Sequence, residues 1–375
     1  MRKSFVKIAL LFLFIILIPL AGCHGKTGEK NEPSPSAHQH TSPSPIDSVA
    51  PLEVDQHTFQ FIIGWLSERE LLIYEWLDQQ AVISSYHVTS GDRKKYLVLD
   101  EPVISANLSP SKTFLLIHTA PSPIEAELSI FQTTTQEKIA AIHIPSSEIY
   151  YEWNPFNERK IFVTAFYEDW TYTNYIYEWY TESLNEIQLS QPFATWMAED
   201  ILIILDWNWE EPSLSAPLVK VSPEGKESVL PGEEFFHFQG KRSVFIGIQA
   251  TKENLTRGEM IVFDYHLNKQ LSFSLPLLTN FSGWEIPFYE ILPGPVLMLI
   301  EPNTGGEADI YDGGFRLIKR NLRTGEEEVV LEDIENGPLL CSPEGKLCLN
   351  GYQSQNIIYT DGKKLEPFLI FREGK

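Results

Sequence analysis

The chain has 375 residues, of which 51 are acidic and 29 are basic, so its formal net charge at pH 7 is −22. Nucleic acids and anionic lipid surfaces bind clustered positive charge, so this balance excludes both as primary partners. Three cysteines are too few for a fold that depends on a framework of disulfides.

The first 22 residues have the pattern of a secretory signal peptide. A basic start precedes an apolar run over residues 8–20, which is shorter than the roughly 20 residues of a membrane span. The sequence LAGC that ends at Cys23 resembles the lipobox of bacterial lipoproteins, in which the cysteine is diacylated and becomes the first mature residue. We therefore expect a diacylglyceryl anchor on Cys23 at the outer face of the cytoplasmic membrane, as in Gram-positive bacteria. An uncleaved anchor and an ordinary secreted protein are the alternatives.

Residues 23–50 form a predicted tether. They contain NEPSPSAHQHTSPSP, which is rich in proline and serine and has almost nothing to bury, a composition typical of flexible segments. Loss of the signal peptide removes three basic residues, so the mature chain carries a net charge near −25. Residues 51–375 remain as the folded domain.

The folded domain is predicted to be all-β. Short apolar runs rich in β-branched and aromatic residues alternate with turn residues, as in FQFIIGW, ELLIYEW, TFLLIHT, KIFVTAF, ILIILDW, SVFIGIQ and NIIYTDG. Their length and composition favour strands.

The turns between these runs recur with a period in the forties. One series of turns precedes a strongly apolar run and comprises Ser67-Glu68, Ser109-Pro110, Asn154-Pro155, Glu199-Asp200, Gln239-Gly240, Pro293-Gly294 and Ser342-Pro343. A second series comprises Ser90-Gly91, Thr134-Thr135, Ser183-Leu184, Pro223-Glu224, Asn268-Lys269, Thr324-Gly325 and Asp361-Gly362. Two interleaved series of seven turns predict a β-propeller of seven four-stranded blades, with six blades as the alternative.

The pentapeptide SPEGK occurs twice, at 222–226 and at 342–346, and belongs to one turn of each series. Proline fixes φ near the value that a turn needs, and glycine accepts a positive φ, so both copies are predicted to form the tight turn of a β-hairpin. Cys341 and Cys348 flank the second copy and are placed to face each other across the hairpin. Outside the cell they are either a disulfide or a pair of thiols.

The lipobox and the full-length series of irregular blades together resemble the YqgU-like propeller lipoproteins of Bacillus-type bacteria. The resemblance implies a six-bladed propeller, whereas the turn count is seven. It implies a fold and a location and carries no established activity.

The two ends of each predicted blade differ in character. Turns between first and second and between third and fourth strands lie at one end, the turn face, and are short and rich in lysine and arginine. Loops between second and third strands and the connections between blades lie at the other end, the loop face. The loop face carries the long loops FYEDWTYTN, DWNWEEPSLSAP, ATKENLTRGE and EPNTGGEADIYDGG. It also carries most of the acidic residues that lie in the connections between blades. Long loops on a rigid scaffold are where binding sites concentrate.

Two of these loops place tryptophans beside acids. The candidate binding residues are Asp169, Trp170, Asp206, Trp207, Trp209, Glu210 and Glu211. Aromatic rings beside carboxylates suit cationic peptide groups, through charge and cation–π contact, and also sugars, through stacking and hydrogen bonds to hydroxyls. For each residue alone, capping of a blade core is the alternative role.

The longest loop is rich in oxygen donors and glycine. Its candidate calcium ligands are Glu301, Asn303, Glu307, Asp309 and Asp312. Calcium takes 6–8 oxygen ligands, but the spacing does not match the EF-hand pattern. We expect no other cofactor.

Motifs of enzymatic chemistry are absent. The chain has no G-x-S-x-G, no H-E-x-x-H, no P-loop and no dinucleotide fingerprint. We therefore expect a non-enzymatic binding or scaffolding module that recognises an envelope protein or peptide, or cell-wall glycan, through its acidic, aromatic loop face. The alternatives are a polysaccharide-active enzyme, of the lyase or glycosidase kind with carboxylates or histidine near the central channel, and a spacer without a ligand.

Overall fold

The structure of the protein, a computed structural model, describes residues 46, 48–211, 213–241, 243–251 and 254–372. The predicted signal peptide, Cys23 and the tether up to residue 45 lie outside the described residues. The compact unit begins at Ile46. The Val49 amide donates to the Tyr359 hydroxyl at 2.8 Å, and the Ala50 amide donates to the Val88 carbonyl at 2.7 Å. Val49 and Ala50, assigned to the tether from the sequence, therefore belong to the folded unit.

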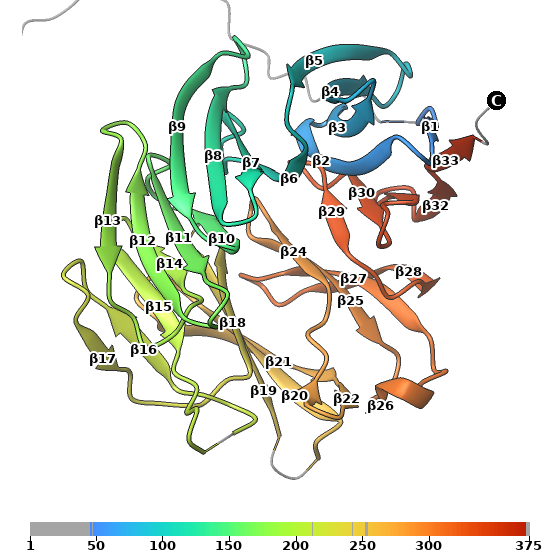
Figure 1. The fold of residues 1–375 in the computed structure, drawn as a ribbon. Helices are drawn as coiled ribbons and strands as arrows, with labels where there is room; N and C mark the ends of the chain where they lie inside the picture. The colour runs from blue at the N-terminus through green and yellow to red at the C-terminus, as the bar shows by residue number, and fades with distance from the viewer. Residues whose placement is uncertain (1–45, 47, 212, 242, 252–253, 373–375) are drawn as a thin grey trace, which may run out of the picture. The chain divides into compact units, whose positions relative to one another are not determined.

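Seven four-stranded antiparallel sheets follow one another along the described chain, each a meander in chain order (Figure 1). Blade 1 comprises β2 (Phe59–Ser67), β3 (Glu70–Leu77), β4 (Gln80–His87) and β5 (Arg93–Leu99). Blade 2 comprises β6 (Val103–Leu108), β7 (Phe114–Ser122), β8 (Glu125–Gln132) and β9 (Lys138–Pro145). Blade 3 comprises β10 (Glu148–Trp153), β11 (Lys160–Phe166), β12 (Tyr172–Glu178) and β13 (Ser183–Ile187).

The remaining four sheets repeat this arrangement. Blade 4 comprises β14 (Thr195–Ala198), β15 (Ile201–Leu205), β16 (Leu218–Val221) and β17 (Glu227–Val229). Blade 5 comprises β18 (His237–Lys241), β19 (Val244–Ala250), β20 (Arg257–Phe263) and β21 (Lys269–Pro276). Blade 6 comprises β24 (Tyr289–Leu292), β25 (Val296–Pro302), β27 (Phe315–Asn321) and β28 (Glu327–Ile334). Blade 7 comprises β29 (Leu339–Cys341), β30 (Leu347–Asn350), β31 (Asn356–Tyr359) and β32 (Lys364–Pro367).

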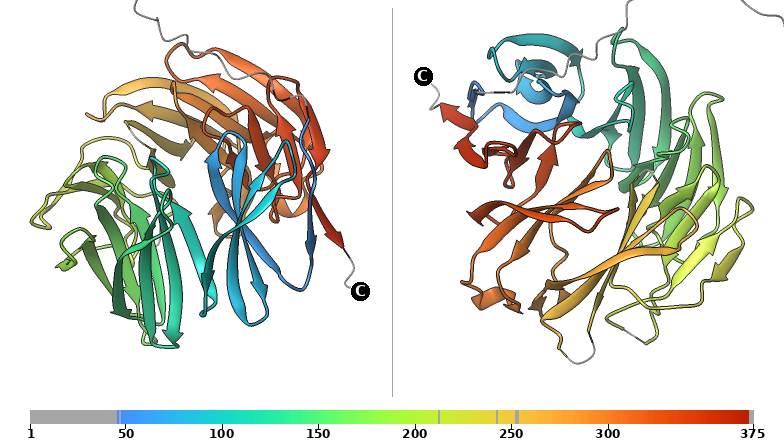
Figure 2. Two further views of the ribbon diagram at one scale, coloured as in Figure 1. Left: turned by 90° about the horizontal axis from the view of Figure 1, so that it is seen from above. Right: turned by 180° about the vertical axis from the view of Figure 1, so that it is seen from behind.

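The first strand of each blade lies innermost, so the sheets are arranged around a common centre (Figure 2). Strand β2 lies beside both β6 and β29, which closes the ring between the first and last blades. The propeller prediction is confirmed, and the structure has the seven sheets that the turn series predicts.

Both faces of each blade are buried, which explains the continuous apolar runs of the sequence. In β3, Leu71 and Ile73 pack in a core shared with blade 7, while Leu72 and Tyr74 pack in a core shared with blade 2. Because side chains alternate across a strand, a strand between two neighbouring blades must be apolar on both sides.

The ring is closed by a separate two-stranded parallel sheet. Strand β1 (Leu52–Asp55) pairs with β33 (Leu369–Arg372), so segments from the two ends of the described unit meet. The Trp65 indole also donates to the Leu340 carbonyl at 2.9 Å, from blade 1 to blade 7. Closure thus uses strands outside the seven blades.

Most predicted turns lie where the sequence placed them. Gln239 and Gly240, however, lie inside β18, and Ser183 and Leu184 lie inside β13, so these two turn positions are wrong by a few residues. An additional small sheet adjoins blade 6: β22 (Leu278–Asn280) and β23 (Gly283–Trp284) precede the blade, and β22 pairs with β26 (Gly306–Glu307) in the loop between β25 and β27, where a 3₁₀ turn, η1 (Ala308–Ile310), follows. This sheet explains the unusual length of the sixth unit.

Within the described part of the chain, no helix is long and apolar enough to cross a membrane.

Candidate binding site on the loop face

A cavity of about 320 Å³ opens among the loop-face ends of blades 3, 4 and 5. The innermost strands of these blades and the segments that flank blade 4 on the loop face supply its walls. Its lining residues are Tyr150, Glu152, Gln191, Phe193, Ala194, Thr195, Ile203, Ile204, Leu205, Trp207, His237, Phe238 and Gln239. The volume lies at the lower end of the range for ligand pockets, roughly 300–1,000 Å³.

Glu152 is the one acidic residue of this lining. It lies on β10 and is partly buried, and its carboxylate accepts hydrogen bonds from the Tyr150 hydroxyl at 2.9 Å and the Thr195 hydroxyl at 3.1 Å. Burial raises the pKa of Glu152 to about 7, although these two hydrogen bonds oppose the shift. The carboxyl group therefore exchanges a proton close to neutral pH.

A second polar group in the lining comes from blade 5. The Nε2 atom of His237 on β18 lies 2.7 Å from the hydroxyl of Tyr289 on β24, and that hydroxyl donates to the Gln239 side-chain oxygen at 3.1 Å. Burial lowers the pKa of His237 to about 4 and raises that of Tyr289. Both groups are therefore neutral at pH 7.

The segment that leads into blade 4 is held firmly against its neighbours. Gln191 donates to the Trp207 carbonyl at 2.8 Å, and Asn174 donates to the Gln191 carbonyl at 3.2 Å. The Thr164 hydroxyl donates to the Pro192 carbonyl. These contacts tie the mouth of the cavity to the sheet of blade 3.

The seven candidate binding residues fall into three groups in the structure. Trp207 lines the cavity, and the carboxylate of Asp206 beside it accepts from Gln191 at 3.4 Å. Trp170 and Trp209 instead lie at loop tips with 95% and 72% of their surface exposed.

The other three candidates lie outside the cavity. Asp169 accepts hydrogen bonds from the amide and hydroxyl of Thr171, which hold its pKa below the usual range, so it is a turn residue. The amides of Glu210 and Glu211 donate to Asn208, and their side chains are exposed.

Exposed apolar side chains are distributed around the loop face. They occur in the second-to-third-strand loops of blades 2 to 7 and in connections between blades: Ile124, Trp170, Phe193, Trp209, Leu214, Leu255, Phe281, Ile286, Ile310 and Tyr352. These are ten of the twenty large apolar side chains exposed among the described residues, and the other ten lie mostly on strands and in turn-face hairpins. Scattered exposed apolar residues are normal, but several at the loop tips of one face are typical of an interaction surface.

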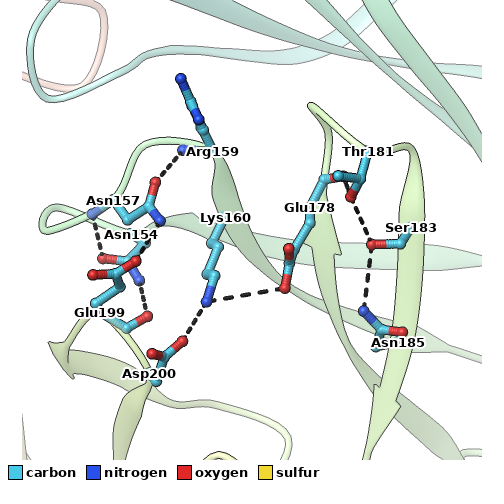
Figure 3. A network of polar contacts seen from close by, with 10 residues as sticks. All are labelled: Asn154, Asn157, Arg159, Lys160, Glu178, Thr181, Ser183, Asn185, Glu199 and Asp200. Carbon is cyan, nitrogen blue, oxygen red and sulfur yellow. Dashed lines mark hydrogen bonds and ion pairs between the residues drawn. The ribbon is translucent and has the colours of Figure 1, made fainter.

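The turn face is occupied by contacts within the protein. Figure 3 shows Lys160 between Asp200 and Glu178, and Asn154 and Asn157 donating to Glu199, which lies in the turn between β14 and β15. Further ion pairs on this face engage Lys241, Lys269, Lys346, Lys363 and Lys364. The lysines predicted to make this face basic are therefore largely neutralised, and several of these contacts link adjacent blades.

The loop predicted to bind calcium does not bring its ligands together. Both Nε and Nη2 of Arg316 donate to the buried carboxylate of Glu301, at 2.9 and 2.6 Å. Asn303 donates to the Gly313 carbonyl, and the remaining acids of the loop are exposed. Among the described residues, no group of three or more histidine, cysteine or acidic side chains is placed to share a metal ion.

Cys341 and Cys348 are directly opposite each other in the β29–β30 hairpin and form a disulfide.

No site role is predicted from the sequence for Tyr150, Glu152 or Thr195, and Gln239 is placed only in a turn. The sequence did contain one signal of the site: Glu152 interrupts the aromatic run IYYEW, and acidic residues are rare in buried strands. The propeller prediction places β10, β14 and β18 in three consecutive blades, but nothing local indicated which of their side chains line a common cavity.

The sequence profile of the YqgU-like 6-bladed beta propeller domain matches residues 87–351. The chain belongs to this family. The match runs from the end of β4 to just beyond β30, so it leaves out most of blade 1 and the outer half of blade 7. The structure nevertheless has seven four-stranded sheets within its described residues, one more than the family description states.

Solved structures support the fold. An uncharacterized protein from Listeria monocytogenes EGD-e is 17% identical with a TM-score of 0.78, covering 87% of this chain and 99% of that one. The β-propeller domain of the trilobed protease from Pyrococcus furiosus is 12% identical with a TM-score of 0.52, covering 84% and 99%. An oligogalacturonate lyase in complex with manganese is 11% identical with a TM-score of 0.52, covering 81% and 92%. At these identities the similarity concerns the fold alone, and no sequence among the curated proteins matches the chain.

Proposed function

We propose that the protein is a lipid-anchored extracytoplasmic binding module that holds a cationic envelope protein or peptide on its loop face. The observation that carries the proposal is the coincidence, on one face, of the exposed apolar loop tips, the acids of the loops and the cavity at Glu152. Apolar anchors surrounded by charge are how protein interfaces combine affinity with orientation.

The charge distribution supports a cationic partner. Asp206, Glu210 and Glu211 lie in the loop that carries Trp207 and Trp209, so a basic segment that contacts the rings also meets carboxylates. The turn face is a weaker candidate, because six of its lysines already form ion pairs within the protein.

In-cell photocrosslinking tests the binding face. A photoreactive amino acid at Trp209 is expected to give a discrete protein adduct, while the same probe at Thr134, exposed in a turn-face hairpin, gives none. The adduct should decrease when Trp170 is changed to Ala, because both tips belong to the same surface. No adduct from position 209, or equal adducts from both positions, would contradict the proposed face.

The anchor is tested separately. We expect Cys23→Ser to prevent incorporation of labelled fatty acid and to release the protein from the membrane fraction. A variant that remains lipidated and membrane-bound would contradict anchoring through Cys23.

A second candidate function is catalysis on a polysaccharide, and a specific observation favours it: a carboxyl group with a pKa of about 7 shares the cavity with His237. A group that titrates near pH 7 suits general acid–base work. Glycosidases mostly use two carboxylates, and the lining contains one, so binding is the better-supported function. Cleavage of a cell-wall or acidic polysaccharide by the wild type and not by Glu152→Gln would make catalysis the better-supported function.

A further inference from the structure

The acids inside the blades differ in their partners. Glu75 on β3 is buried and pairs with Arg93, and Glu301 on β25 is buried and pairs with Arg316. In both cases the chain supplies a guanidinium group, as expected where a carboxylate leaves water, because an unpaired buried charge is strongly destabilising.

Glu152 has no such partner. The side-chain contacts of its carboxylate are the hydroxyls of Tyr150 and Thr195, and none of the residues that line the cavity is a lysine or an arginine. The structure thus places a carboxylate at the wall of a cavity with hydrogen-bond donors on one side and no counter-charge.

The titratable groups around Glu152 do not supply this charge. Tyr150 on β10 is neutral because burial raises its pKa, and His237 on β18 is neutral because burial lowers its pKa. Asp206, at the end of β15, is another acid. When Glu152 is ionised, the lining therefore offers no positive charge to balance it, and a ligand could supply one.

We propose that this cavity binds a primary ammonium or guanidinium group, the head of a lysine or arginine side chain of the partner, as an ion pair with Glu152. Trp207 in the same lining provides an aromatic ring for the cation or for its aliphatic stem. This inference rests on the proposed function and names the group that the loop face would recognise.

The test uses two peptides that differ only in the charged head: acetyl-Gly-Lys-Gly-amide and the same peptide with norleucine. Binding to the mature protein is measured by calorimetry and by ligand-observed NMR at pH 8. We expect the lysine peptide to bind at least about tenfold more tightly than the norleucine peptide, the usual effect of one charge-assisted contact. Glu152→Gln should abolish that difference. Glu137→Gln, which removes one exposed acid from a turn of blade 2, should preserve it.

A pH series gives a second readout. Because a cation binds the ionised form of Glu152, affinity for the lysine peptide should fall roughly tenfold or more between pH 8 and pH 5.5. Norleucine peptide binding should not change with pH. Thermal unfolding of Glu152→Gln establishes that the variant is folded.

Three results would overturn the inference: equal binding of the two peptides, a lysine preference that survives Glu152→Gln, or binding of a neutral N-acetylglucosamine oligomer in place of the lysine peptide. The proposed function fails separately. If photocrosslinking from position 209 gives its adduct while the lysine peptide does not bind, the loop face remains a binding surface and only the assignment of the cavity is wrong.

Discussion

At the scale of single residues, the acids inside the blades show how burial fixes a side chain's role. Glu75 on β3 is 3% exposed and receives Arg93 from β5. The pair is worth little as a net source of stability, but removal of the cation leaves a carboxylate without compensation.

We therefore expect Arg93→Met to lower the free energy of unfolding at pH 7 by about 1–3 kcal/mol, less than for a fully buried pair because the Arg93 side chain is 31% exposed. Lys95→Ala, two positions along β5 and exposed, should change stability by less than about 0.5 kcal/mol. Urea unfolding of both variants measures the difference, and equal effects would argue against an uncompensated Glu75.

Glu152 leads to a pH prediction for the unliganded protein. Its folded pKa of about 7 lies above its ordinary value, so between about pH 4.5 and pH 7 the folded state holds a proton that the unfolded state has lost. Stability from this group is therefore present at low pH and decreases as the pH rises through that window. Glu152→Gln should gain about 1–3 kcal/mol relative to the wild type between pH 4.5 and pH 8. A difference that does not change with pH across urea titrations would contradict the raised pKa.

At the scale of elements, the turns between first and second strands do more than reverse the chain. The Asn154 side chain is fully buried, accepts from the amides of Phe156 and Asn157, and donates to the Glu199 carbonyl of the next blade at 2.8 Å (Figure 3). Similar links join Ser111 to Glu158 and Ser342 to Glu68. Polar turn residues thus connect neighbouring blades in three places.

Asn154→Ala should consequently lower the free energy of unfolding by about 2–4 kcal/mol, because it removes three hydrogen bonds made by a fully buried side chain. Asn157→Ala, at a partly exposed site whose side chain donates to the exposed Glu199 carboxylate and accepts from the Arg159 amide, should cost about 1 kcal/mol or less. Chemical denaturation of the two variants compares them under one condition. A smaller loss of stability in Asn154→Ala than in Asn157→Ala would contradict the proposed role of Asn154 in connecting the blades.

The elements also show what the sequence can and cannot predict. Strands and turns were predictable because their signals are local: apolar runs make the blades, and proline, glycine and asparagine mark the reversals. The face on which each long loop lies could also be predicted, because the strands of every blade follow one another in meander order. The pairing of β1 with β33 and the presence of Glu152 and His237 in one cavity were not predictable, since each joins segments that are distant in sequence and carry no signal of one another. The arrangement of the predicted calcium ligands was unpredictable for a related reason, because Arg316, a residue outside the ligand pattern, forms an ion pair with Glu301.

At the scale of the whole molecule, stability depends on closing the ring between blades 1 and 7. One core cluster spans the closure and includes Leu52 and Leu369, which are directly paired across β1 and β33. Because blade 7 takes all four of its strands from one continuous segment, no shared blade holds the ends together. The two extra strands and this cluster do so.

Leu369→Ala should therefore open the closure rather than weaken the propeller evenly. We expect a loss of about 2–4 kcal/mol in the free energy of unfolding, as for other buried leucines, and under about 1 kcal/mol for Ile370→Ala, the adjacent residue at 40% exposure. Amide hydrogen exchange locates the effect: it should accelerate in β2 to β4 and in β30 to β32, with blade 4 unchanged, because local opening releases the elements that the cluster holds. Acceleration spread equally over all seven blades would mean that the ring opens as a single cooperative unit and that β1 and β33 are not its weak point.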